Sequence, residues 1–95
     1  MYRIKPYSYN QANLLGVQIF PSDNPKYKIE VYDKSGKFLF YIGDAKKYLN
    51  NDYATYLETH NKQYADERRR LYRLRHAKEG NKKGTKGYYS FNILW

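Results

Sequence analysis

The chain has 95 residues, no cysteine and a formal net charge of +9, which indicates one small domain without disulfides or thiolate metal sites. Its mean hydropathy is −1.02 and no run approaches the ~18 apolar residues of a membrane span, so we expect a soluble, intracellular protein without membrane insertion. A chain of this length has a thin core, and thirteen tyrosines suit it because their rings pack while their hydroxyls stay hydrated.

Residues 1–25 are expected to form an arm and a first strand. Residues 1–13 are rich in tyrosine and asparagine but lack periodicity, and at most a short strand is expected at 2–5. The apolar run 14–20 predicts a strand, and the sequence PSDNP that follows is typical of a turn.

A β-hairpin is predicted for residues 26–42. Two apolar triplets recur at the period of two of a half-buried strand: Tyr27, Ile29 and Val31, then Phe38, Phe40 and Ile42. Between them, residues 33–36 read DKSG, a turn in which glycine adopts positive φ. The two triplets should therefore share one face.

Residues 52–79 are predicted to be helical. Asp52 is a candidate N-cap for a short helix from Tyr53 to His60, and a longer helix should run from Lys62 to Lys78, with Gly80 ending it. The sequence therefore predicts an α+β fold, in which a small antiparallel hairpin or sheet packs on one short and one long basic helix.

The sequence RRRLYRLRH, residues 68–76, concentrates the charge. Residues 62–86 hold ten Lys/Arg and three acidic residues, a net of +7, which favours a polyanion or an acidic protein surface as partner. On a wheel at ~100° per residue, Tyr64, Ala65, Leu71 and Tyr72 fall within roughly 120°. Arg68 and Arg75 fall in the same arc, so they should either pair internally or contact a ligand, whereas Arg69, Arg70 and Arg73 should face solvent.

The residues after the long helix divide into a basic loop, 80–87, and an apolar segment, 88–95. The candidate residues for binding a polyanion or partner are Arg68, Arg69, Arg70, Arg73, Arg75, Lys82, Lys83 and Lys86. The segment YYSFNILW is too apolar to stay exposed, and its candidate protein-contact residues are Tyr88, Tyr89, Leu94 and Trp95. We expect it to fold back as a strand or turn over the helix, placing Trp95 and a carboxylate beside Arg75 or His76. The alternative is that Trp95 is an anchor for a neighbouring protein.

Enzymatic chemistry has little support in the sequence. The serines lie in no nucleophile motif, GNKKGTKG lacks the spacing of a phosphate-binding loop, and the two histidines, His60 and His76, lack the spacing of a helical metal pair. We therefore predict no catalytic residue, no metal site and no cofactor.

The C-terminal part resembles a family of small basic proteins encoded by large eukaryotic DNA viruses. The similarity covers roughly residues 26–95, and some relatives carry a tryptophan in the loop where this chain has lysine, glycine and asparagine. The shared features are an acidic–aromatic sequence at the start of the helical region, an R-x-x-Y-x-x-RH helix, a glycine-containing loop and a Leu-Trp ending. The matching residues are Asp52, Tyr53, Tyr56, Arg69, Tyr72, Arg75, His76, Gly84, Gly87, Tyr88, Tyr89, Leu94 and Trp95.

Two functions follow from these features. The resemblance implies a virion-associated role, and we expect a non-enzymatic structural protein, a minor capsid or scaffold component held by other virion proteins. The alternative is a nucleic-acid-binding protein that coats or condenses viral DNA through phosphate contacts. Either one places the protein in the virion, and in the host cytoplasm or nucleus during infection.

Overall fold

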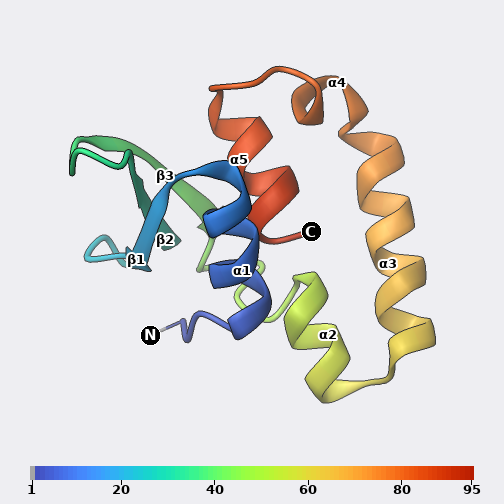
Figure 1. Ribbon diagram of the computed structural model, residues 1–95. Coiled ribbons are helices and arrows are strands. Elements are labelled where there is room, and N and C mark those ends of the chain that lie inside the picture. The colour runs from blue at the N-terminus through green and yellow to red at the C-terminus, as the bar shows by residue number, and fades with distance from the viewer. Residues whose placement is uncertain (1) are drawn as a thin grey trace. The chain divides into compact units, whose positions relative to one another are not determined.

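The computed structural model describes residues 2–95 and has an α+β fold, as predicted. Within these residues a three-stranded antiparallel sheet follows one helix, and four further helices follow the sheet (Figure 1). The chain forms two compact units, one ending at Leu49 and the other spanning Asn50–Trp95. They are called the sheet unit and the helical unit below.

The first helix, α1 (Pro6–Leu15), lies in the region predicted to be an arm, so that prediction is wrong. Pro6 occupies the first helical position, where no N–H donor is needed and the ring already fixes a helical φ. Gly16 ends the helix at φ 73° and donates its N–H to the carbonyl of Asn13 over 3.1 Å. The strand expected from residue 14 therefore begins only at Gln18, and residues 2–5 form no strand.

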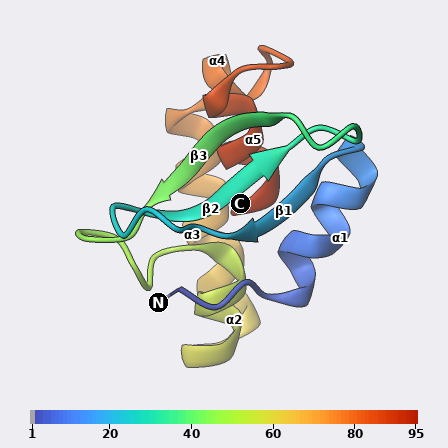
Figure 2. The same ribbon diagram turned by 90° about the vertical axis from the view of Figure 1, so that its left-hand side faces the viewer.

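The sheet has the order β1-β2-β3 (Figure 2), with bounds β1 (Gln18–Pro21), β2 (Tyr27–Tyr32) and β3 (Phe38–Asp44). The predicted hairpin is confirmed as β2 and β3. In its turn, the Asp33 carboxylate accepts the main-chain N–H groups of Ser35 and Lys37, each over 2.9 Å. Gly36 has φ 92°, the left-handed conformation that the turn required.

The hairpin register places most of the two apolar triplets on one face. Paired across the strands are Ile29 with Ile42 and Val31 with Phe40. A bulge between Val31 and Tyr32 then shifts the register, so Phe38 pairs with Tyr32. Phe38 therefore lies on the opposite face, contrary to the prediction, because one irregularity in a strand reverses the side of every residue beyond it.

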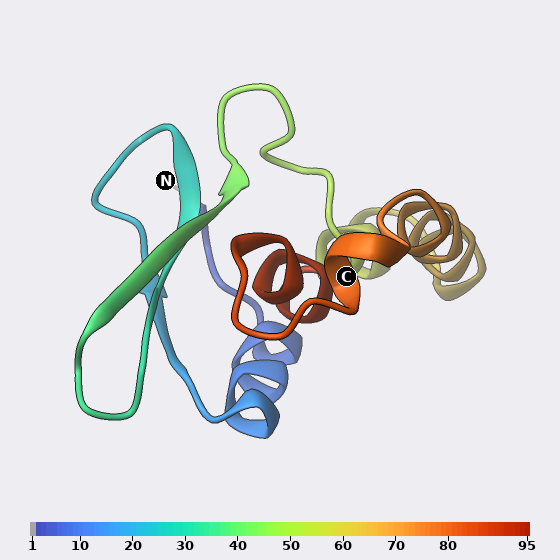
Figure 3. The ribbon, with the colours of Figure 1, turned by 90° about the horizontal axis from the view of Figure 1, so that it is seen from above.

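The helical unit contains α2 (Tyr53–Thr59), α3 (Lys62–Arg75), α4 (Ala77–Gly80) and α5 (Lys86–Ile93). Asp52 caps α2 as predicted, accepting the N–H of Thr55 over 2.9 Å. The long helix α3, seen almost along its axis in Figure 3, ends before its predicted limit at Lys78, because His76 leaves the helical conformation at φ −111°, ψ 22°. In Figure 1, α4 lies where the chain turns from α3 into α5.

The C-terminal segment forms the helix α5, so the predicted strand or turn is wrong. Thr85 caps this helix by accepting the N–H of Tyr88 over 3.3 Å. Two glycines allow α4 and α5 to approach closely: a Cβ on Gly80 would lie 2.7 Å from ring atoms of Phe91, and one on Gly87 would lie 2.6 Å from Cβ of Glu79. None of the helices in residues 2–95 has the length and apolar character needed to span a bilayer.

Candidate interaction surface of the arginine-rich helix

The inward face of α3 is turned from the predicted one by roughly 70° on the helical wheel. Its buried centre is Ala65, with 0% exposure, and Arg69, Tyr72 and His76 continue the same face at helical spacing. Tyr64 is 40% exposed and Arg75 is also exposed. Arg75 therefore does not belong to the packed arc, which corrects its predicted position.

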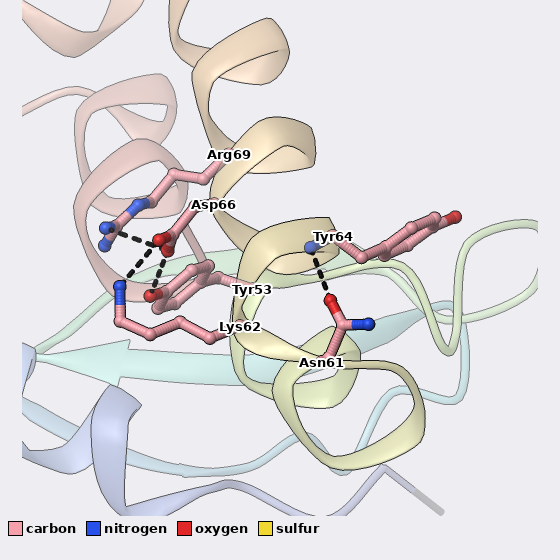
Figure 4. A network of polar contacts seen from close by, with 6 residues as sticks. All are labelled: Tyr53, Asn61, Lys62, Tyr64, Asp66 and Arg69. Atoms are coloured by element: carbon pink, nitrogen blue, oxygen red, sulfur yellow. Dashed lines mark hydrogen bonds and ion pairs between the residues drawn. The ribbon is translucent and has the colours of Figure 1, made fainter.

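Arg69 was expected in solvent but is built into a polar network between α2 and α3 (Figure 4). Its guanidinium lies 3.9 Å from the centre of the Tyr53 ring and its Nη2 lies 3.7 Å from Asp66. The Asp66 carboxylate also accepts hydrogen bonds from the Tyr53 hydroxyl over 2.8 Å and from the Lys62 ammonium over 2.6 Å. One carboxylate thus joins α2 to two cations of α3.

The network changes the acidity of its members. Hydrogen bonds, first from Lys62 and then from Tyr53, lower the pKa of Asp66. Burial, followed by the bond to Asp66, raises the pKa of Tyr53. Lys62 is largely exposed, so its ion pair with Asp66 adds little stability, whereas Tyr53 is buried and its hydroxyl needs the partner.

Arg73 was also expected in solvent and is also directed inward. Its Nη2 donates to the main-chain oxygen of Trp95 over 3.0 Å, and its guanidinium lies 5.1 Å from the centre of the Phe91 ring. Arg68, which the wheel placed inside, lies 5.9 Å from the Tyr56 ring. These contacts lie at cation–π distance, so both arginines help to join α3 to other elements of the helical unit.

The end of the chain is packed against α3. The ring of Trp95 stacks on Tyr72 at a centroid distance of 4.4 Å and an interplanar angle of 8°. His76 stacks on Tyr72 at 4.2 Å. Leu94 and Trp95 are 2% and 8% exposed. The predicted fold-back of this segment is confirmed, but the cation beside Trp95 is Arg73 instead of Arg75 or His76.

Of the four residues proposed to contact another protein, Leu94 and Trp95 are thus used inside the unit. Tyr88 and Tyr89 are half-buried and keep part of their surface open. Their rings contact each other edge to face at 5.4 Å.

The remaining cations gather where α3 passes through α4 into the loop before α5. Arg70 faces solvent as predicted and forms two hydrogen bonds with Glu67, of 2.6 and 3.1 Å. Four other exposed side chains form no hydrogen bond or ion pair within residues 2–95: Arg75, Lys78, Lys82 and Lys83. We call these four the cationic end. Lys86, the first residue of α5, is exposed beside it.

Lys78 was absent from the predicted site, although its position in the charged run was a sufficient signal. The predicted site also left out the second face of the sheet, where Phe20, Tyr32, Phe38 and Tyr41 lie together. Alternation of residues along the hairpin strands places Tyr32 and Tyr41 on this face, but the bulge that also places Phe38 there could not be predicted from alternation. No group of three or more His, Cys, Asp or Glu residues able to hold a metal occurs in the described part of the chain.

The chain matches no protein-family model, and no curated protein or solved structure is significantly similar to it.

Proposed function

We propose that the protein is a non-enzymatic structural protein of a large DNA virus virion, a minor capsid or scaffold component that acts through contacts with other virion proteins. The viral setting comes from the resemblance of residues 26–95. The observation that carries the structural role is the use of Arg68, Arg69 and Arg73 within the helical unit. All three arginines lie against rings, and Arg69 and Arg73 also bind an oxygen of Asp66 or Trp95. They therefore hold the helices together and have less of their charge free for phosphates.

A second function, coating or condensing DNA, is favoured by the cationic end. Its four cations have no hydrogen-bond or ion-pair partner within residues 2–95, and exposed cations attract phosphates through counterion release, independent of sequence. The same surface also suits an acidic protein. Charge alone therefore does not choose between the two functions.

Two experiments separate these functions. Crosslinking of purified virions followed by mass spectrometry should join lysines of this protein to another virion protein, even after nuclease treatment. Absence of the protein from virions, or crosslinks that depend on DNA, would contradict the structural role.

Binding of the purified protein to duplex DNA should be measured against salt concentration. If the cationic end coats DNA, the logarithm of affinity should fall with a slope of about −3 to −4, as expected for four neutralised phosphates. Replacing all four cations by glutamine should remove that dependence. A matched control replaces four exposed lysines of the sheet unit by glutamine: Lys26, Lys34, Lys37 and Lys46. If the protein has only the structural role, the salt dependence of its DNA affinity should already be weak, and neither the cationic-end variant nor the control variant should change it.

A further inference from the structure

The sheet has two unlike faces. Ile19, Ile29, Val31 and Ile42 lie on one face, and none of them is more than 5% exposed. Phe20 of β1 and Tyr41 of β3 are the register partners of Glu30, so these three lie side by side on the other face. Tyr32 and Phe38 form the next pair on that face.

The second face is a continuous cluster of rings. Ring centroids are 5.5 Å apart for Phe20 and Tyr32, 5.6 Å for Tyr32 and Phe38, and 4.8 Å for Phe38 and Tyr41. Phe20 is 47% exposed and Phe38 is 42% exposed. We call these four residues the aromatic face. Two phenylalanines this exposed on a small sheet form an apolar patch on the surface, and such patches mark interaction sites.

Two carboxylates accept hydrogen bonds from the tyrosine hydroxyls of this face. Glu30 is 8% exposed and accepts the hydroxyl hydrogen of Tyr32 over 2.7 Å. Asp23 is exposed and accepts that of Tyr41 over 3.0 Å. Each carboxylate keeps further acceptor positions after this bond. Asp23 can therefore bind a donor directly, while Glu30 places negative charge just beneath the rings.

The chemistry of the aromatic face is suited to a cation. Rings attract ammonium and guanidinium groups through their faces, and carboxylates hold the same groups by charge-assisted hydrogen bonds. The cation on the same side of β2, Lys28, is only 2% exposed and its ammonium lies 5.2 Å from the centre of the Tyr2 ring. Its ammonium is therefore shielded from direct contact with an incoming ligand.

We infer that the aromatic face binds an extended basic segment of a partner protein, with an arginine or lysine bound by Asp23 above the charge of Glu30 and apolar side chains over Phe20 and Phe38. The inference rests on the proposed function in taking protein contacts as the mode of action. Nucleic acid fits this face less well, because two carboxylates among the rings repel phosphates. A second copy of the chain also carries basic segments, and the self-association measurement below identifies that occupant.

The test uses the full chain and a short fluorescent peptide of alternating arginine and leucine, with fluorescence anisotropy as the measurement. The variant Glu30→Gln with Asp23→Asn keeps both acceptor oxygens for the tyrosines but removes the charges. It should weaken peptide binding at least about tenfold, since charge-assisted bonds are lost. Phe20→Ala and Phe38→Ala should each weaken it about threefold.

Matched controls exclude general effects of charge and surface. Glu58→Gln makes a single charge change on an exposed position of the helical unit, and Leu14→Ala removes an apolar side chain that is 81% exposed on α1. Both should bind the peptide like the natural chain. A peptide of alternating glutamate and leucine should not bind. Thermal unfolding of each variant confirms that the fold persists.

Three outcomes would overturn the inference. One is peptide binding that the aromatic-face variants leave unchanged, or no binding at all. Another is binding of single-stranded oligothymidylate that Phe20→Ala and Phe38→Ala abolish, which would make the face a base-stacking platform. The third is self-association in sedimentation that Glu30→Gln removes. None of these changes the virion crosslinks, so failure here remains distinct from failure of the proposed function.

Discussion

Gly80 offers a test in which the backbone conformation and the side-chain packing predict opposite signs. Gly80 ends α4 but does not adopt positive φ, so alanine fits the backbone there. At such a position Gly→Ala usually stabilises a protein by about 0.4–1 kcal/mol, because it restricts the unfolded chain. In the structure, however, the new Cβ would lie 2.7, 2.7 and 2.8 Å from three ring carbons of Phe91.

The expected change follows from that overlap. Carbon atoms in contact prefer about 3.5–4.0 Å, so α4 and the Phe91 ring must separate by about 1 Å. The ring cannot move freely, since Tyr72 and the Arg73 guanidinium lie against it. Overpacking of this kind costs about 1–3 kcal/mol, and Gly80→Ala should therefore lower the free energy of unfolding by about 1–2 kcal/mol after the chain-entropy gain.

Urea unfolding followed by far-UV circular dichroism and by Trp95 fluorescence measures this change. A double-mutant cycle with Phe91→Ala should give a coupling of at least about 0.5 kcal/mol, because removing the ring removes the overlap. Gly84→Ala is the control. Its φ is 83°, so alanine is strained, but apart from its chain neighbours no described residue lies within 4 Å of the added Cβ, and no coupling to Phe91 is expected. Stabilisation by Gly80→Ala, or zero coupling, would refute the close packing of α4 on α5.

Three further measurements test other contacts. The emission of Trp95 should be blue-shifted and resistant to acrylamide, and Tyr72→Ala should shift it to the red; a water-exposed spectrum in the natural chain would contradict the stack. The hydrogen bond to Glu30 raises the pKa of Tyr32 from 10.0 to about 12. Subtracting the alkaline absorbance titration of Tyr32→Phe from that of the natural chain isolates Tyr32, and its midpoint should lie near pH 12. A midpoint at pH 10.0 would disprove the bond. Because folding raises this pKa, the stabilisation is complete below pH 10.0 and disappears as pH rises through about 12. Asp52→Ala should lower the free energy of unfolding in urea by at least about 1 kcal/mol, because it removes the cap of α2, and Asp52→Asn should lower it less. Equal losses for the two variants would assign the effect to something other than the cap.

Signals confined to a few adjacent residues predicted their elements correctly. The turn at residues 33–36 needs only a carboxylate and a glycine with positive φ, and the cap of α2 needs only Asp52 and the N–H three residues later. The helix α1 carried similar signals in Pro6 and Gly16, but its weak apolar pattern concealed them. Here the information was present in the sequence and the interpretation was wrong.

The C-terminal segment could not be assigned from its own residues. YYSFNILW is apolar enough for either a strand or a helix, and short apolar runs do not distinguish them by periodicity. Its helical form depends on the Thr85 cap and on the close approach of α4, which Gly80 and Gly87 permit. The apolar character did predict that Trp95 would be buried, since that follows from hydrophobicity whatever the backbone does.

In the arginine-rich helix, some properties are determined by the sequence and others only by the tertiary structure. Sequence alone set the helix, its charge and the need of its inward cations for partners, because these depend on residue type and spacing. Which arginines turn inward depended on rings supplied by distant residues: Tyr53 lies under Arg69, and Phe91 lies beside Arg73. A guanidinium packs favourably wherever a ring and an acceptor meet it, so a wheel that counts arginine only as polar turns the helix to the wrong side.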